Sequence, residues 1–171
     1  VAGFLTHRID TELMDHIAEE FGKHFNMDEV TMILTAEASG IALSAIVAQH
    51  FHKPMIFAKK AKSDNIEGGL YQSDIFSYTY KKKVTLLVSK EWLSADDKVL
   101  IIDDFMANGE AMRGLCDIVT AAGATLVGIG CAVEKGFQGG GDRLRAAGVN
   151  LKSLAIIESA EPGNIVFRDE E

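Results

Sequence analysis

Two adjacent carboxylates, Asp103 and Asp104, stand directly after an unbroken apolar run and before a loop of small residues. The whole segment, Val99–Ala111, has the sequence VLIIDDFMANGEA. Such an apolar run is typical of a buried strand, and ligands of parallel sheets lie beyond the carboxyl ends of the strands. Small residues at the start of a helix let backbone N–H groups approach an anion closely, and the helix dipole favours negative charge there. Acids beside such an anion site would face a ribose diol or water-bound Mg²⁺ rather than the anion.

Two further segments could meet anionic charge. The turn after the apolar run Val30–Ala36 consists of small residues and one acid, and it could offer backbone donors or be a plain strand-to-helix turn. A basic pair follows a second short apolar run, and it could supply point cations or be a solvated turn. The residues of the first anion loop are Ala107, Asn108, Gly109, Glu110 and Ala111, those of the turn are Glu37, Ala38, Ser39 and Gly40, and those of the basic pair are Lys59 and Lys60.

The apolar periodicity predicts strands that alternate with helices. Predicted helices cover residues 10–25, 41–52, 109–122 and 142–147, and predicted strands cover 30–36, 55–58, 75–80, 84–89, 99–102, 124–133, 154–157 and 165–167. This alternation predicts an α/β fold with a mostly parallel sheet and helices on both faces. Residues 63–73 are rich in turn formers and predict a flexible loop before a hairpin. We find no repeat or linker and expect a single domain over residues 1–171, with further residues upstream because Val1 is not Met.

Composition excludes several classes of protein. The formal net charge of −8 argues against a protein that mainly holds nucleic acid, because such binding depends on Lys and Arg. No apolar run approaches the ~20 residues that a membrane span needs, and no signal peptide is visible. Cys116 and Cys131 lie in apolar stretches without a CxxC motif, so we expect free thiols in a reducing compartment, the cytoplasm.

The segment 99–111 resembles the phosphoribosyl pyrophosphate (PRPP) signature of type I phosphoribosyltransferases. That family usually has Thr at positions 108 and 111, whereas Ala-Asn-Gly in this loop resembles the xanthine phosphoribosyltransferase subgroup. The stretches FLTHRID near the start, AEASGIA at 36–42, FAKK at 57–60 and VEKGFQ at 133–138 are similar to segments of the same subgroup and stand in the same order. The resemblance therefore covers nearly the whole chain.

The resemblance implies a purine salvage enzyme that joins xanthine to PRPP, with Mg²⁺, and yields xanthosine 5′-monophosphate and pyrophosphate. Asp103 and Asp104 would be catalytic by orienting the ribose hydroxyls, with Mg²⁺ bound through substrate and water and no direct protein ligand. The loop 107–111 would hold the 5′-phosphate. The turn 37–40, with Lys59 and Lys60, would hold pyrophosphate, and a cis peptide is expected at Glu37–Ala38. The resemblance also implies a homodimer and a hood over the site at residues 62–73.

The purine itself is implied less directly. Lys135 would donate to an exocyclic oxygen of a 6-oxopurine, and Phe137 or Phe105 would stack on the ring. Thr6 would be a further base contact, but xanthine-specific relatives carry Asn there, and a hydroxyl makes fewer hydrogen bonds. Guanine, hypoxanthine or adenine therefore stay open as alternative bases.

Two other classes of protein compete with this interpretation. A PRPP-sensing transcriptional regulator would need a DNA-binding module, and neither that module nor a basic face is evident. A Rossmann dinucleotide enzyme would need a glycine fingerprint between a strand and a helix. The pair Gly128 and Gly130 lies inside a predicted strand and lacks the third glycine.

Overall fold

The computed structural model describes residues 2–61, 68–78 and 81–169, built around one eight-stranded sheet. The helices are α1 (Thr11–His24), α2 (Gly40–Phe51), α3 (Glu110–Ala121) and α4 (Gly140–Ala146), with short helical turns η1 (Ala2–Thr6) and η2 (Gly136–Gln138). The strands are β1 (Met32–Ala36), β2 (Met55–Ala61), β3 (Leu70–Ser77), β4 (Lys82–Ser89), β5 (Lys98–Met106), β6 (Thr125–Lys135), β7 (Leu151–Glu161) and β8 (Asn164–Phe167).

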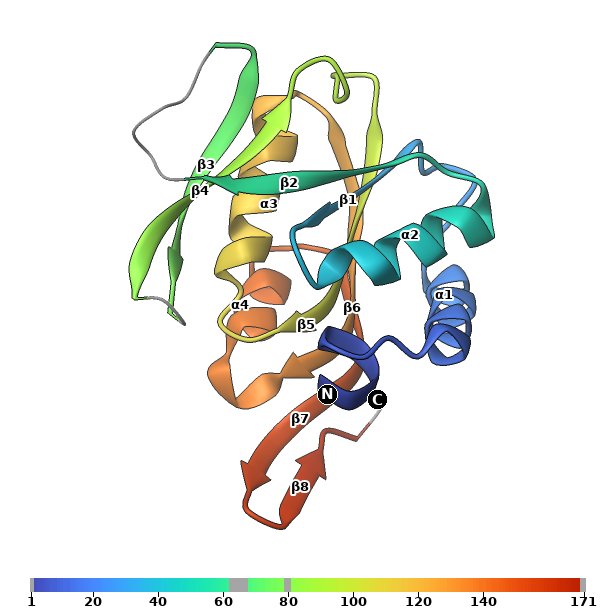
Figure 1. The fold of residues 1–171 in the computed structure, drawn as a ribbon, viewed down its shortest axis with the longest axis vertical. Helices are drawn as coiled ribbons and strands as arrows, with labels where there is room; N and C mark the ends of the chain where they lie inside the picture. Colours follow the sequence, from blue (N-terminus) through green and yellow to red (C-terminus); the bar gives the residue numbers. More distant parts are fainter. Residues whose placement is uncertain (1, 62–67, 79–80, 170–171) are drawn as a thin grey trace.

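The sheet has the order β3-β4-β2-β1-β5-β6-β7-β8 (Figure 1). The central strands β2, β1, β5, β6 and β7 run parallel to one another. The hairpin β3–β4 joins the β2 edge antiparallel, and β8 joins the β7 edge antiparallel. The predicted mostly parallel sheet is confirmed, and its antiparallel edges make it mixed. The strand order reverses between β1 and β5, which is where ligands of open α/β sheets bind.

Helices cover both faces of the sheet, as the alternation of elements predicts. Residues next to each other on one strand point to opposite faces, so β1 sends Ile33 into the core beneath α1 and α2, and Leu34 into the core beneath α3. The hairpin β3–β4 packs on the α3 side through Ile75 and Leu86. Because both faces of β5 are covered, its whole apolar run is buried.

Helix α1 shows how the sequence fixes an element locally. The Asp10 carboxylate accepts a hydrogen bond from the Leu13 N–H at 3.0 Å, which satisfies one of the free donors of the first turn. Met14, Ala18 and Phe21 follow at helical spacing and are fully buried. The amphipathic stripe therefore decides which face of the helix meets the sheet.

Several strand boundaries differ from the prediction. Strand β5 continues to Met106 and so includes Asp103 and Asp104, and β7 covers Leu151–Glu161 instead of 154–157. Strand β3 begins at Leu70, so residues 70–73 are strand and not loop, while residues 62–67 of the predicted hood lie outside the described residues. Strand β2 continues to Ala61, because β4 supplies antiparallel partners for it. Strand β6 continues to Lys135 because it pairs with β7 as far as Ile157. In each case pairing with a neighbouring strand of the sheet extends an element past the point where apolar periodicity ends.

Two other expectations concern cysteine and membranes. Cys116 and Cys131 are free thiols, as predicted, and Cys131 is buried. None of the helices in the described parts of the chain is long and apolar enough to cross a membrane.

The core beneath α1 gives a first prediction. Phe21→Ala should lower the free energy of unfolding by about 3–5 kcal/mol, because a fully buried ring is replaced by a cavity. Leu13→Ala, on the exposed side of the same helix, should change it by no more than about 0.5 kcal/mol. Urea unfolding of both variants checks this, and equal losses would contradict the packing described.

Candidate active site

Asp103 and Asp104 lie near the carboxyl end of β5, beside the strand β1 and at the reversal of strand order. Both are buried, with exposed fractions of 9% and 1%. The backbone N–H of Asp104 donates to Asp103 Oδ1 at 2.9 Å, and the Ser39 hydroxyl donates to Asp104 Oδ1 at 3.1 Å. The other oxygen of Asp104, Oδ2, is buried and has no hydrogen-bond partner.

The electrostatic environment differs from that of two solvated acids. Burial raises the pKa of Asp103 well above its ordinary value, and the neighbouring Asp104 carboxylate raises this pKa further. The hydrogen bond from the Asp104 backbone N–H and the positive charge of Lys60 act in the opposite direction. A carboxyl group held this way is poised to meet a polar or cationic ligand.

The turn 37–40 lies directly against the acid pair. Its Glu37–Ala38 peptide is cis, as predicted. Gly40 begins α2, and a Cβ there would collide with Thr35 Oγ1 and lie 2.7 Å from Asp103 Oδ1. Only glycine allows the helix start to approach the acids this closely. The turn is tied to β2 as well, because the Glu37 N–H donates to Ala58 O at 3.0 Å.

The basic pair is placed differently from the prediction. Lys59 and Lys60 lie within β2, paired with Leu87 and Leu86 of β4, and not in a turn after it. Since neighbouring strand residues point to opposite faces, the two lysines cannot both face the acids. Lys60 is the one whose charge acts on Asp103, and its backbone N–H donates to the Glu37 carboxylate.

The loop 107–111 connects β5 to α3. Gly109 has φ of 83°, a left-handed conformation that suits glycine, and it caps the helix. The Asn108 carboxamide oxygen accepts the Glu110 N–H at 3.0 Å. The carbonyl oxygens of Ala107 and Asn108 lie against Gly140, and Arg143 Nη2 donates to Asn108 O at 2.8 Å. The carbonyl oxygens of Ala107 and Asn108 thus lie on the α4 side of the loop, and that of Asn108 accepts a hydrogen bond there.

The side chain of Glu110 interacts with groups outside the loop 107–111. Its carboxylate accepts from Arg113 Nε at 3.1 Å and from the Phe76 N–H at 3.0 Å. These two interactions, Arg113 first, lower the pKa of Glu110. The carboxylate therefore ties α3 to the hairpin strand β3, and only the backbone of Glu110 is left for an anion in the loop.

The predicted base-binding residues occupy four elements, with Phe105 in β5. Lys135 ends β6, and its Nζ lies 4.9 Å from the centroid of the Phe105 ring, within cation–π distance. Phe137 in η2 is half exposed, with 51% of its surface accessible. Thr6 is exposed at the end of η1, which Leu5 anchors in the core beneath α1 and α2. The structure thus brings Lys135 of β6 close to Phe105, which follows the acid pair on β5.

Sequence reasoning missed the arginines that hold these loops. Arg143 on α4 bonds to the loop carbonyl of Asn108, and Arg145 on the same helix bonds to the buried Glu134 carboxylate. Arg113 on α3 bonds to the partly exposed Glu110 carboxylate. The only signal was their position in helices directly after the two loops.

Comparison with known proteins agrees with this geometry. The family model described as phosphoribosyl transferase domain matches residues 7–148. The chain belongs to the phosphoribosyltransferase family. Among similar phosphoribosyltransferases, the xanthine phosphoribosyltransferase of Lachnoclostridium phytofermentans is 50% identical over 173 residues, covering 100% of this chain and 89% of that protein. The xanthine phosphoribosyltransferase of Bifidobacterium longum is 52% identical over 171 residues, covering 98% and 89%.

Solved structures show the same fold. The adenine phosphoribosyltransferase of Giardia lamblia has a TM-score of 0.75 at 23% identity and covers 87% of this chain and 81% of that one. That of Trypanosoma brucei has a TM-score of 0.73 at 24% identity and covers 91% and 68%. At these identities the likeness supports the phosphoribosyltransferase fold alone.

The Mg²⁺ expected with PRPP was tested against the donors present. Within residues 2–61, 68–78 and 81–169, no group of three His, Cys, Asp or Glu side chains is arranged to hold a metal ion. Asp104 Oδ2, a buried carboxylate oxygen without a partner, is the kind of hard donor that Mg²⁺ or its water ligands prefer. Asp104 therefore fits as a donor to a magnesium ion or to one of its water ligands.

The raised pKa of Asp103 gives a second prediction. Between the ordinary Asp pKa of about 3.9 and the raised folded value, the native state binds more protons than the unfolded state, so wild-type stability falls as pH rises. Asp103→Asn does not titrate, so it should be more stable than wild type at pH 7, and the difference should shrink toward pH 4. Urea unfolding across this range measures the difference.

The exposed Asp96→Asn variant controls for removal of one negative charge. It should show no comparable gain at pH 7. A gain for Asp103→Asn that stays constant or grows as pH falls would contradict the burial of an unfavourable charge.

Proposed function

We propose that this protein is a xanthine phosphoribosyltransferase, which converts xanthine and PRPP to xanthosine 5′-monophosphate and pyrophosphate. The observation that carries the proposal is a buried acid pair flanked by two small-residue loops at the reversal of strand order. The choice of xanthine rests on relatives of that name that are about half identical over nearly the whole chain.

The reaction replaces pyrophosphate on the anomeric carbon of ribose with a purine nitrogen. Its transition state has oxocarbenium character, as in other glycosidic chemistry, and it needs no protein nucleophile. Asp103 and Asp104 orient the ribose hydroxyls and offset the positive charge that develops on the sugar. Their fixed positions hold the sugar in line between the leaving group and the base.

The 5′-phosphate is held by the backbone of Ala107, Asn108, Gly109, Glu110 and Ala111. The carbonyls of Ala107 and Asn108 are engaged against α4, which favours backbone N–H groups as the donors on the ligand side. The start of α3 adds the favourable end of a helix dipole. A phosphate would take over the Glu110 N–H from the Asn108 side chain.

Pyrophosphate is held by the turn Glu37, Ala38, Ser39 and Gly40 and by a lysine of β2. The proximity of Lys60 to Asp103 favours Lys60 over Lys59 for this role. Bound Mg²⁺ supplies neutralisation of pyrophosphate charge as the leaving group departs. Ser39 bonds to Asp104, so the turn and the acid pair form one hydrogen-bonded unit.

The base lies near Lys135, with Phe105, Phe137 and Thr6 as further contacts. The Lys135 ammonium is a donor only, so it suits the exocyclic oxygen of xanthine, guanine or hypoxanthine and not the amino group of adenine. Its ammonium lies 4.9 Å from the centroid of the Phe105 ring. The free thiols are consistent with a cytoplasmic protein, and a homodimer is proposed from the family resemblance.

The proposal is tested by incubating the protein with PRPP, Mg²⁺ and each purine separately. Xanthosine 5′-monophosphate and pyrophosphate should form in equal amounts and only before chelation of Mg²⁺. If the protein used another purine in preference to xanthine, the base would be reassigned and the phosphoribosyltransferase activity would stand. PRPP binding without nucleotide formation from any purine would contradict the enzyme assignment and favour a PRPP sensor.

A third prediction concerns the acid pair. Asp104→Asn should lower kcat by about 100-fold or more, because an amide cannot offset positive charge on the sugar. Its free energy of unfolding should change by only about 1 kcal/mol, because the amide oxygen still accepts from Ser39. Steady-state kinetics and urea unfolding check the two effects. Wild-type turnover in the variant would refute the role of Asp104.

A fourth prediction concerns the base. Lys135→Met keeps an unbranched apolar side chain beside Phe105 but removes the ammonium group with its donors and charge. It should raise KM for xanthine by about 10-fold or more while KM for PRPP changes by less than about twofold. Phe137→Leu, which keeps an apolar side chain in η2, serves as a comparison for loss of stacking alone. An unchanged KM for xanthine in Lys135→Met would remove Lys135 from the base site.

A further inference from the structure

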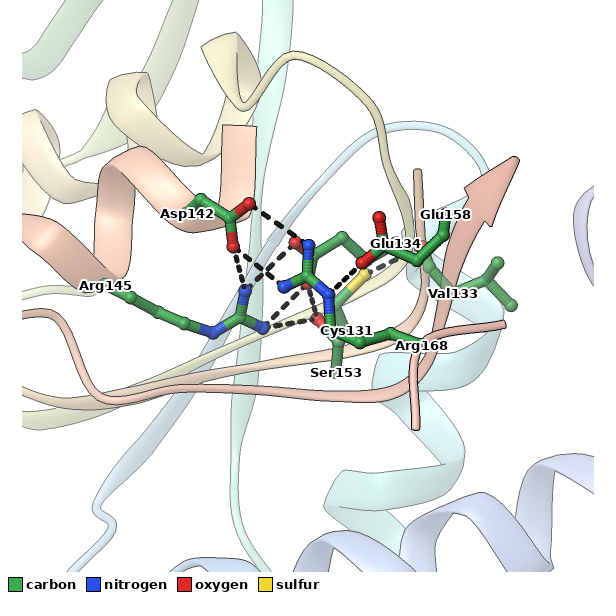
Figure 2. Close-up of polar contacts among 8 residues, drawn as sticks. All are labelled: Cys131, Val133, Glu134, Asp142, Arg145, Ser153, Glu158 and Arg168. Atoms are coloured by element: carbon green, nitrogen blue, oxygen red, sulfur yellow. Dashed lines mark hydrogen bonds and ion pairs between the residues drawn. The ribbon is translucent and has the colours of Figure 1, made fainter. Parts of the chain in front are cut away.

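A polar network surrounds the side chain of Glu134, the residue before Lys135 in the sequence (Figure 2). Its centre is the carboxylate of Glu134, which is completely buried. Arg145 donates from Nη1 to Oε1 at 3.0 Å and from Nη2 to Oε2 at 2.8 Å, and the Ser153 hydroxyl donates to Oε2 as well. A bidentate arginine pair of this kind fixes orientation as well as charge.

The sequence places this buried carboxylate next to the proposed base contact. Residues next to each other on a strand point to opposite faces, so Glu134 faces α4 and Lys135 points the other way, toward Phe105. The two side chains leave consecutive residues of the same strand backbone. Fixing the Glu134 side chain therefore also fixes the direction of the Lys135 side chain.

Helix α4 is seated directly on this network. A Cβ at Gly141 would collide with Glu134 Oε1, and a Cβ at Gly140 would lie 2.5 Å from the carbonyl carbon of Asn108. These two successive glycines thus let the start of α4 contact both Glu134, next to Lys135, and the phosphate loop 107–111. Arg143 makes the same connection, because it donates to Asn108 O at 2.8 Å and lies 3.5 Å from Gln138 O.

A second layer joins the C-terminal segment to α4 (Figure 2). Arg168 binds both oxygens of Asp142, at 2.9 and 3.1 Å, and pairs with Glu158 of β7. Its backbone N–H donates to Ile156 O at 2.8 Å. Asp142 also lies 3.3 Å from Arg145 Nη1, so the outer layer holds the guanidinium that holds Glu134.

Stability alone is a weak reason to keep such a network. A buried ion pair loses hydration and is often replaceable by apolar residues without loss, whereas it specifies one geometry. The geometry specified here is that of the strand end at Lys135 and the turn η2. We infer that Glu134, Arg145 and Ser153 are positioning residues for base recognition, acting through Lys135 without touching the base. This inference rests on the proposed function.

The test compares Arg145→Met, Glu134→Ala and Glu134→Gln with wild type in the full chain. Arg145→Met and Glu134→Ala should raise KM for xanthine by about 10-fold or more. KM for PRPP should change less than about twofold, because the phosphate loop is held by Arg143, which these variants leave in place. Glu134→Gln should recover part of the loss, since its amide oxygen still accepts from Arg145. Calorimetry should show weakened binding of xanthosine 5′-monophosphate and unchanged binding of ribose 5-phosphate.

Ile118→Ala is the matched control for destabilisation. Ile118 is fully buried near the C-terminal end of α3 and is not a member of the Glu134 network, so this variant lowers stability without touching that network. It should leave both KM values unchanged. If the Glu134 and Arg145 variants keep a normal KM for xanthine, or lose affinity for xanthosine 5′-monophosphate and ribose 5-phosphate alike, the inference is overturned. Failure of the wild-type protein to form nucleotide from any purine would instead contradict the proposed function.

Discussion

The structure is organised around two carboxylates that must stay at a nearly dry sheet edge. Charge in such a place is unfavourable unless polar groups compensate it. The compensation comes from the Asp104 N–H, the Ser39 hydroxyl and the charge of Lys60. One buried oxygen, Asp104 Oδ2, has no hydrogen-bond partner. That remaining deficit is what a sugar hydroxyl or a hydrated magnesium ion can fill, so the burial that weakens the fold prepares the site.

Close approach of backbones follows from this constraint. To bring donors to a buried acid pair, the start of α2 must press against Thr35 and Asp103, and only glycine at position 40 leaves the space. The start of α4 uses Gly140 and Gly141 in the same way, against the phosphate loop and Glu134. The main chain of two helix starts thereby comes close to the buried carboxylates Asp103 and Glu134.

The sequence was informative where a local pattern decides the outcome. The apolar run before Asp103 predicts a central strand because only a strand covered on both faces buries such a run, and the acids at its end follow directly. It could not decide between Lys59 and Lys60, because β2 extends through them only by pairing with β4. Nor could it place the Glu110 carboxylate, whose partner Phe76 lies 34 residues away. The proposed roles of the site residues remain predictions from family resemblance that this geometry accommodates.

Arginines explain how a loop of small residues keeps one orientation. A flexible loop could turn either its carbonyls or its N–H groups toward a ligand, and only the second arrangement binds an anion. Arg143 holds the Asn108 carbonyl on the α4 side, and Arg113 holds Glu110 while donating to Asp74 O of β3 at 2.8 Å. The polarity of the loop is therefore set from outside it, by helices on either side. Because the same α4 also seats Glu134 behind Lys135, the groups proposed for phosphate and for base share one rigid support.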